Sequence, residues 1–448
     1  MIRRRATRAA LASAVAVFFA GCSVVGSRSA PVTPEPVPDP VVSVDAPTGT
    51  DPGVTPPRLA RPADGVDRDP IVHSRWTLHP EIRERVAYWT DRYAVRDGHA
   101  FPLFLERMAP YEMVVDSALA AEGLPQSLRY IPVIESGYLT SATSPMRAVG
   151  LWQFMAPTAR SFGMHVSTLI DERRDPVKST VAAARYLREL EERFGSWFLA
   201  LAAYNSGPYR VESLLREHAP LAPRGDSLYT VIFPHLPSET RDFVPKLIAV
   251  ASVAERLHEW GIEAPEPGEL YAFDEVVVPD ATSFDVVAEA AGVEEEVVRI
   301  LNPHILRGLT PRGQPTTIRL PPGTADRFAE AYALIPPDRR VTVTEHIVSS
   351  GETLGGIAGQ YGIRLSELQA ANPGVNPRRM RIGTRLVVPV EGSTRPAAAP
   401  ANGEHVVRSG ESLWIIARRY DTTVARLRSL NGLREGAVLQ PGDRIRIS

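Results

Sequence analysis

The chain has 448 residues, which is too long for one typical domain and predicts about two to four. Its 50 basic and 52 acidic side chains leave a net charge of −2, which excludes nucleic acid as a partner attracted by bulk charge. With Cys22 as its one cysteine, the chain cannot form an intramolecular disulfide.

The first 21 residues have the pattern of a bacterial export signal. Arginines precede a short apolar run from Ala9 to Ala20, which is too short to span a membrane as a helix. The run ends in FAGC, which resembles a lipobox, so we expect a lipoprotein signal peptide over 1–21 and a lipidated Cys22. Acyl chains there would anchor the protein in a membrane. The alternative is a plain secretory signal with an incidental cysteine.

Residue Ser23, next to this cysteine, resembles the outer-membrane sorting signal of Gram-negative bacteria. From 22 to 69 the chain is rich in proline and almost free of large apolar side chains, so it cannot bury a core. At about 3.1 Å per residue this tether would reach on the order of 100 Å. We therefore expect a protein held at the outer membrane, facing the periplasm, that works at a distance.

Residues 70–262 are expected to form a mainly α domain. Helical apolar spacing predicts helices over 113–123, 176–195 and 196–207. The second begins at Asp175-Pro176, a capping residue before a proline, and ends at Gly195.

The C-terminal part contains an internal repeat. Eight positions recur at a constant offset without a gap. They are His346, Gly351, Leu354, Ala358, Tyr361, Leu368, Asn372 and Gly383, which recur as His405, Gly410, Leu413, Ala417, Tyr420, Leu427, Asn431 and Gly442. The pattern predicts strand–helix–helix–strand (βααβ) modules at 344–390 and 404–448, joined by a linker at 391–403. A looser copy is expected at 271–322.

One carboxylate stands alone in the stretch from 129 to 158. Around Glu135 lie Ile131, Ile134 and Tyr138, and no other acid follows before Asp171. Apolar surroundings disfavour a charged carboxylate and raise its pKa, which suits a general acid near neutral pH. The alternative is a surface glutamate near a helix end.

Several motifs in fixed order now resemble a known family. The motifs are ESGY at 135–138, SP at 144–145, GLWQFM at 150–155 and AYNSG at 203–207. Together they resemble the lytic transglycosylases, and within them the membrane-bound type D enzymes. The C-terminal repeats resemble LysM domains. The resemblance implies a multidomain protein, in which a lysozyme-like helical domain precedes small α+β LysM modules.

The resemblance also implies a reaction. Glycosidic bonds are normally cleaved by two carboxylates, yet the stretch around Glu135 supplies one. In this family such a residue acts first as acid and then as base on the C6 hydroxyl of the substrate. The bond between N-acetylmuramic acid and N-acetylglucosamine in peptidoglycan breaks, a 1,6-anhydro ring forms, and the 2-acetamido group assists. No cofactor and no metal ion are expected.

Supporting residues follow by matching position. Ser144 and Gln153 are expected to orient Glu135 or the substrate, and the Tyr204 hydroxyl to hydrogen-bond Glu135. Asn205 and Glu239 are expected to contact the substrate. For Tyr204 and Asn205 the alternative is a plain helix end, and Trp152 and Phe154 are interpreted as packing residues. Val149 stands where the family more often has a small residue.

Other acidic residues could supply a second carboxylate, so two alternative functions stay open. Asp171, Glu172 and Asp175 precede a helix and lie beside arginines, which favours capping and ion pairing. A hydrolysing muramidase would instead use Asp171 or Glu239 as a second carboxylate. A non-enzymatic cell-wall tether would only bind glycan.

The LysM resemblance implies contacts with the N-acetylglucosamine of glycan strands. The expected positions are Gly351, Thr353, Leu354 and Asn372 in the first module, and Gly410, Ser412, Leu413 and Asn431 in the second. Two tethered modules would raise the local concentration of glycan at the catalytic domain.

Overall fold

We describe the fold from a computed structural model. It covers residues 69–447, apart from Asp97, His99, 265–269, Pro373, 390–402, Asp421 and 435–436. The expected signal peptide, Cys22 and nearly all of the tether lie outside the described residues, as does most of the 391–403 linker. Within the described ranges, no helix is both long enough and apolar enough to cross a membrane.

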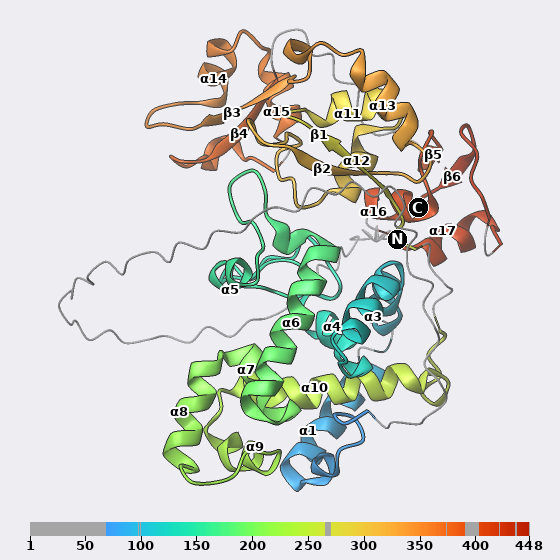
Figure 1. The fold of residues 1–448 in the computed structure, drawn as a ribbon. Coiled ribbons are helices and arrows are strands. Elements are labelled where there is room, and N and C mark those ends of the chain that lie inside the picture. The colour runs from blue at the N-terminus through green and yellow to red at the C-terminus, as the bar shows by residue number, and fades with distance from the viewer. Residues whose placement is uncertain are drawn as a thin grey trace, which may run out of the picture. The chain divides into compact units, whose positions relative to one another are not determined.

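The N-terminal part of the described chain is helical (Figure 1). Its α-helices are α1 (Pro80–Asp91), α2 (Phe101–Met108), α3 (Glu112–Ala121), α4 (Ile131–Ser136), α5 (Ala156–Ser161), α6 (Pro176–Phe194), α7 (Trp197–Ser206), α8 (Pro208–His218), α9 (Ser227–Ile232) and α10 (Ser238–Glu255). Two short non-α turns matter for the site: the π-helix η2 (Arg92–Arg96) and the 3-10 helix η4 (Gln126–Tyr130).

The ends of α6 are those that the sequence predicts. The Asp175 carboxylate accepts hydrogen bonds from the amides of Val177 (2.8 Å) and Lys178 (3.1 Å), which satisfies two free donors of the first turn. Gly195 ends the helix with a φ of 60°, a left-handed conformation that costs glycine little.

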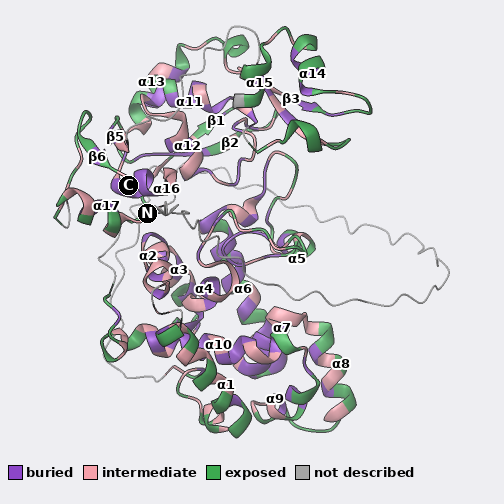
Figure 2. Cartoon of the chain, turned by 180° about the vertical axis from the view of Figure 1, so that it is seen from behind, coloured by how far each residue is buried: buried purple, intermediate pink, exposed green. Residues whose placement is uncertain are grey.

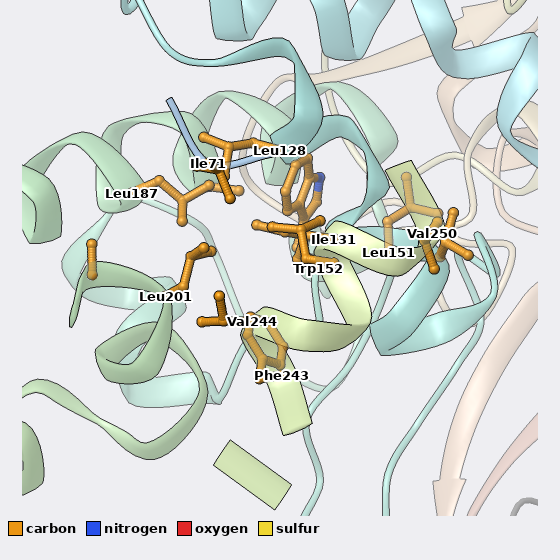
Figure 3. Packing of buried hydrophobic residues seen from close by; sticks show 14 of the residues in the cluster. Ile71, Leu128, Ile131, Leu151, Trp152, Leu187, Leu201, Phe243, Val244 and Val250 are labelled. Atoms are coloured by element: carbon orange, nitrogen blue, oxygen red, sulfur yellow. The ribbon is translucent and has the colours of Figure 1, made fainter. Parts of the chain in front are cut away.

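Helix α7 forms the centre of the helical core. Its residues from Phe198 to Ala203 are all buried, so packing partners surround the helix on every side. Helix α10 packs against both α1 and α7, and Figure 2 shows α7 and the middle of α10 as buried. Figure 3 shows Leu151 and Trp152 in this core together with Phe243 and Val244 of α10.

Three βααβ modules follow, each with one antiparallel strand pair. They consist of β1 (Asp274–Val278), α11 (Phe284–Ala291), α12 (Glu295–Leu301) and β2 (Thr316–Leu320); β3 (Val343–Ile347), α14 (Leu354–Gln360), α15 (Leu365–Ala371) and β4 (Arg385–Pro389); β5 (Glu404–Val406), α16 (Leu413–Arg419), α17 (Val424–Asn431) and β6 (Arg444–Arg446). A helical domain followed by small α+β modules confirms the predicted fold class. The first module continues past residue 322 with α13 (Ala325–Ala333), which packs on α11.

One asparagine joins the second helix to the last strand in every module. The Asn372 amide nitrogen donates to the carbonyls of Leu368 (2.8 Å) and Val387 (2.7 Å), and its oxygen accepts from the Val387 amide (2.9 Å). Asn302 and Asn431 make the same three bonds in their modules. A side chain that satisfies both a helix end and a strand explains why asparagine recurs at this position.

Candidate active site

Glu135 occupies the last turn of α4, and the chain reverses directly behind it. Gly137 (φ 59°) and Tyr138 (φ 62°) are both left-handed. That conformation is strained for a bulky residue, and the buried Tyr138 is held in it by a hydrogen bond of 2.8 Å from its hydroxyl to the Arg129 carbonyl. The backbone that carries Glu135 is therefore fixed by its surroundings.

The electrostatics of Glu135 match the expectation of a general acid. The pKa of Glu135 is raised to about 8, mainly by burial and also by the charge of Glu239, against a lowering effect of the Lys246 charge. The carboxyl group is therefore mainly protonated at neutral pH and can donate a proton. The residue keeps part of its surface exposed, so a substrate oxygen can reach it.

The turn from 150 to 154 lies against α4. Gly150 has a φ of 86°, and a Cβ there would stand 1.8 Å from the Arg173 carbonyl oxygen, so only glycine fits. Gln153 is also left-handed (φ 49°), and its amide donates to the Gly150 carbonyl at 2.8 Å. The Leu151 carbonyl accepts a hydrogen bond of 2.8 Å from Ser136, which ties the turn to the residue after Glu135.

Tyr204 lies near Glu135 but binds a different group from the one expected. Burial, followed by the nearby charge of Glu135, raises the pKa of Tyr204 well above its usual value. Its hydroxyl donates to the Trp152 carbonyl at 2.7 Å instead of to Glu135. The left-handed Gln153 follows Trp152 in this turn. Trp152 itself is buried and donates through Nε1 to Thr180 at 2.9 Å, which fits its interpretation as a packing residue.

Of the remaining expected residues, Asn205 and Glu239 lie where α7 meets α10, whereas Ser144 lies in a separate loop. Asn205 accepts a hydrogen bond of 2.7 Å from Thr240 of α10, and the neighbouring Glu239 is exposed in the first turn of that helix. This bond fixes the start of α10 to the end of α7. Ser144 uses its hydroxyl within its own loop, where it accepts from the Ala148 amide at 3.0 Å. The structure thus brings Tyr204 and Glu239 to Glu135, while Ser144 serves its own loop.

The other candidate carboxylates, Asp171, Glu172 and Asp175, form ion pairs away from Glu135. Asp171 binds the Arg173 guanidinium through both oxygens at 2.8 Å, and both side chains are buried. Asp175 caps α6 and pairs with Arg319 at 2.9 Å. Glu172 pairs with Lys178 at 2.5 Å. These contacts confirm the interpretation of the three residues as capping and ion-pairing residues. Among the rival acids, Glu239 is left as the one whose charge acts on Glu135.

Lys246 is the residue near Glu135 that sequence reasoning missed. It follows Glu239 by seven positions and Asp242 by four on α10, which places all three on one helix face. This helical spacing is the feature of the sequence from which Lys246 could have been placed beside Glu239 and Asp242. The packing of α10 against α1 and α4, through which the charge of Lys246 reaches Glu135, is a long-range contact that the spacing does not reveal.

The expected glycan-contact residues of the LysM modules have structural roles. Thr353 and Ser412 cap α14 and α16 by accepting from the amides of Gly356 (3.1 Å) and Ile415 (3.3 Å). Gly351 and Gly410 turn the chain with φ of 83° and 79°. Leu354 and Leu413 lie in the module cores, and Asn372 and Asn431 make the internal bonds described above. Glycan contact at these positions stays a prediction.

Comparisons with known proteins agree with this arrangement. The family model of the transglycosylase SLT domain matches residues 113–222, which include Glu135 and Tyr204. The LysM domain model matches 346–389 and 405–448. A model described as the LysM-like domain of lytic transglycosylase MltD matches 272–337, the range that includes α13.

Two individual relatives match different shares of the chain. The chain is 28% identical over 351 residues to membrane-bound lytic murein transglycosylase D of Escherichia coli, which covers 76% of each protein. It is 34% identical over 106 residues to the N-acetylmuramoyl-L-alanine amidase sle1 of Staphylococcus epidermidis, which covers 23% of this chain and 32% of the amidase.

Among solved structures, the lytic transglycosylase Slt of Pseudomonas aeruginosa matches with 28% identity and a TM-score of 0.28, over 36% of this chain and 26% of that one. The soluble lytic transglycosylase Slt70 of Escherichia coli matches with 24% identity and a TM-score of 0.30, over 45% of this chain and 40% of that one. The family models thus give the chain a transglycosylase SLT domain followed by LysM domains, and over three quarters of its length it is similar to a type D lytic transglycosylase.

Proposed function

We propose that the helical domain cleaves the β-1,4 bond between N-acetylmuramic acid and N-acetylglucosamine in peptidoglycan without consuming water. The observation that carries this function is the protonated, partly exposed Glu135 inside the SLT domain, in surroundings where Asp171 and Asp175 are bound to arginines. With both aspartates bound to arginines, Glu135 is favoured as the one residue that both gives and takes the proton.

The reaction balances around Glu135. Its carboxyl group gives a proton to the glycosidic oxygen, and the bond from that oxygen to the anomeric carbon breaks. The 2-acetamido oxygen of the same sugar stabilises the positive charge that develops at the anomeric carbon. The Glu135 carboxylate then takes the proton of the C6 hydroxyl, whose oxygen bonds to the anomeric carbon. The products are a 1,6-anhydro sugar and a glycan end, and Glu135 is protonated again.

Glu239 supports a second candidate, a hydrolysing muramidase. Its charge acts on Glu135, and in a hydrolase it would be the second carboxylate that activates a water molecule. The two candidates differ in product: hydrolysis leaves an ordinary reducing end instead of an anhydro ring. The type D relative favours the first candidate.

The test of catalysis is the substitution Glu135→Gln, which keeps the size and removes the proton donor. The purified variant is expected to clear a suspension of peptidoglycan at least about a hundredfold more slowly than the parent, since general acids contribute 10²–10⁴-fold. Glu217→Gln, at an exposed position of α8, is the matched control and should leave the rate unchanged. A Glu135→Gln protein as fast as its parent would favour a cell-wall tether that only binds.

The LysM modules and the N-terminus complete the proposal. The matches to the LysM domain support glycan binding by 346–389 and 405–448, through backbone groups around Gly351 and Gly410. The export-signal pattern and the membrane-bound relative support a lipid anchor at Cys22, in the outer membrane facing the periplasm. A Cys22→Ser protein should leave the membrane fraction, and its retention there would contradict the anchor.

A further inference from the structure

The two LysM domains share a fold but differ along their first helix. This helix reads LGGIAGQ in α14 of the first domain (346–389) and LWIIARR in α16 of the second (405–448). Three exposed glycines of α14 are thus replaced by large side chains in α16, namely Gly355 by Trp414, Gly356 by Ile415 and Gly359 by Arg418. A Cβ at Gly355 or Gly359 would meet no described atom within 4 Å, so this face of α14 has room for larger side chains that it does not carry.

Helix α16 is buried on two faces, of which its own domain covers one. All residues from Leu413 to Ala417 are buried (Figure 2). Leu413, Ile416 and Ala417 lie in the core of the second LysM domain, and their counterparts are the buried residues of α14. Trp414 and Ile415 lie instead in the core cluster of the helical domain. A helix that is apolar all round needs packing partners on every side, so α16 needs a partner outside its domain.

Two tyrosines hold the Trp414 ring. Its centroid lies 6.2 Å from that of Tyr111 and 5.6 Å from that of Tyr271, both in edge-to-face geometry, and the two tyrosines lie 5.3 Å apart. Such aromatic pairs add to the stabilisation that burial provides. Tyr111 follows α2 in the helical domain, and the amide of Tyr271 donates to the Pro110 carbonyl at 2.8 Å. A buried tryptophan that fills a site on another domain is typical of the anchor of an interface.

Polar contacts lie beside this aromatic cluster. The Arg418 guanidinium donates to the hydroxyl of the buried Thr140 in the helical domain at 3.1 Å. Thr423, which caps α17, forms a hydrogen bond with the carboxylate of Glu106 in α2. Gly359, which takes the place of Arg418 in the first LysM domain, has no side chain to donate such a bond. An apolar centre with polar contacts around it is the usual arrangement of a specific interface.

The turn before α16 is also packed against another part of the chain. A Cβ at Gly410 would stand 2.7 Å from the side chain of Val293 in the 272–337 module, and Arg408 pairs with Glu294 of that module at 2.5 Å. The corresponding turn of the first LysM domain is different, because a Cβ at Gly351 would meet no described atom within 4 Å. Of the two turns that are expected to bind glycan, one is therefore covered and the other is open.

We propose that α16 is a docking helix: Trp414 anchors the second LysM domain on the helical domain, and in this docked state the Gly410 turn is covered, whereas the Gly351 turn stays open to glycan. The proposal rests on the proposed function, in which both LysM domains bind glycan. The two copies then have different tasks. The first captures a glycan strand, and the second binds glycan only after α16 has left its site. By linkage, glycan at the Gly410 turn opposes docking as much as docking opposes glycan.

The first test needs no glycan. The full chain is labelled with 5-fluorotryptophan, and Trp414→Phe assigns one of its six fluorine signals. The change of each signal between light and heavy water measures exposure to solvent. We expect almost no change for Trp414, and a large one for the tryptophan that Gly355→Trp introduces at the equivalent position of α14. Tyr111→Leu should move the Trp414 signal, because it removes a neighbouring ring of the other domain. A Trp414 as exposed as the introduced tryptophan, or unmoved by Tyr111→Leu, would overturn the proposal.

The second test measures binding to insoluble peptidoglycan by sedimentation, with Glu135→Gln in every protein so that the glycan is not digested. The triple variant Trp414→Gly, Ile415→Gly and Arg418→Gly gives α16 the residues of α14, with which the first LysM domain folds. We expect it to bind at least about tenfold more tightly, because a second tethered site becomes available. Protection of the Arg446 amide, which Asn431 binds, shows that the domain is still folded.

Two further variants complete the second test. Tyr111→Leu weakens docking from the side of the helical domain and leaves the LysM domain unaltered, so it should also tighten binding. Val438→Gly, the control, removes an apolar side chain of the second LysM domain that is 80% exposed, and should leave binding unchanged. Equal binding by the parent, the triple variant and Tyr111→Leu would overturn the proposal.

The tests separate the proposal from the function on which it rests. A parent chain that neither binds nor cleaves peptidoglycan would overturn the proposed function. A Trp414 signal protected from solvent in that same chain would still support the docking of α16.

Discussion

The hydroxyl of Tyr204 donates a hydrogen bond of 2.7 Å to the main-chain carbonyl of Trp152, 52 residues away. This bond joins the end of α7 to the left-handed turn at Gln153. The same turn accepts a hydrogen bond from Ser136, the residue after Glu135. Tyr204 thus supports Glu135 through the backbone that carries it.

Tyr204→Phe tests this connection. The ring should still pack against Phe243, but the Trp152 carbonyl loses its donor, so we expect the free energy of unfolding to fall by about 1–2 kcal/mol. Cleavage should slow by about tenfold or more, because small displacements of a catalytic group are costly. Urea unfolding and peptidoglycan clearance measure the two effects. An unchanged rate would show that Glu135 is positioned without this bond.

Glu135 should make stability depend on pH. Its pKa is about 8 in the folded protein against an ordinary value of 4.5, so folding takes up a proton between these values. The protonated Glu135 contributes its full share to the free energy of unfolding below pH 4.5. This share is lost as the pH rises from 4.5 through 8, and above that the free energy of unfolding no longer changes because of Glu135. Glu135→Gln avoids this loss. At pH 8 the variant should therefore be more stable than the parent by roughly 4 kcal/mol, with no difference at pH 4. Urea unfolding at both pH values tests this, and equal stability at pH 8 would contradict the raised pKa.

The Asp171–Arg173 pair should be structural. Arg173→Met leaves a buried carboxylate without its partner and should cost about 3–5 kcal/mol of stability. The double variant with Asp171→Asn should recover part of that loss, and both losses are read from thermal unfolding. Folded Asp171→Asn protein should cleave peptidoglycan to the same product as the parent. A rate reduced as severely as in Glu135→Gln would instead make Asp171 the second carboxylate of a muramidase.

Substitution of the recurring asparagine in one βααβ module should destabilise that module and leave the other modules unchanged. Asn372→Ala leaves the Val387 amide and two carbonyls without their partner and should destabilise the 346–389 module by about 1–3 kcal/mol. Amide hydrogen exchange at Val387 should accelerate, while exchange at Arg446, which Asn431 binds, should not change. Unchanged exchange at Val387 would show that the helix–strand connection does not depend on Asn372.

Local chemistry made much of the fold predictable. Asp175-Pro176 and Gly195 mark both ends of α6, because caps act within one turn. The repeat predicts the βααβ modules, since each short copy contains a strand, two helices and a second strand in that order. Helix α13 lies beyond the matched copies, so the repeat could not indicate it.

The site was predictable in part. A lone acid among apolar neighbours indicates Glu135 directly, because desolvation depends on those neighbours. The partner of the Tyr204 hydroxyl and the approach of Lys246 to Glu135 depend on how α7 and α10 pack, over separations that no local pattern spans.

The nature of the cleavage product tests the central claim most directly. Peptidoglycan is digested by the full chain in water enriched in heavy oxygen, and the fragments are weighed by mass spectrometry. Cleavage by Glu135 alone predicts muramic acid ends lighter by one water and without heavy oxygen. Reducing ends that carry one heavy oxygen atom each would show attack by water, and would contradict the account.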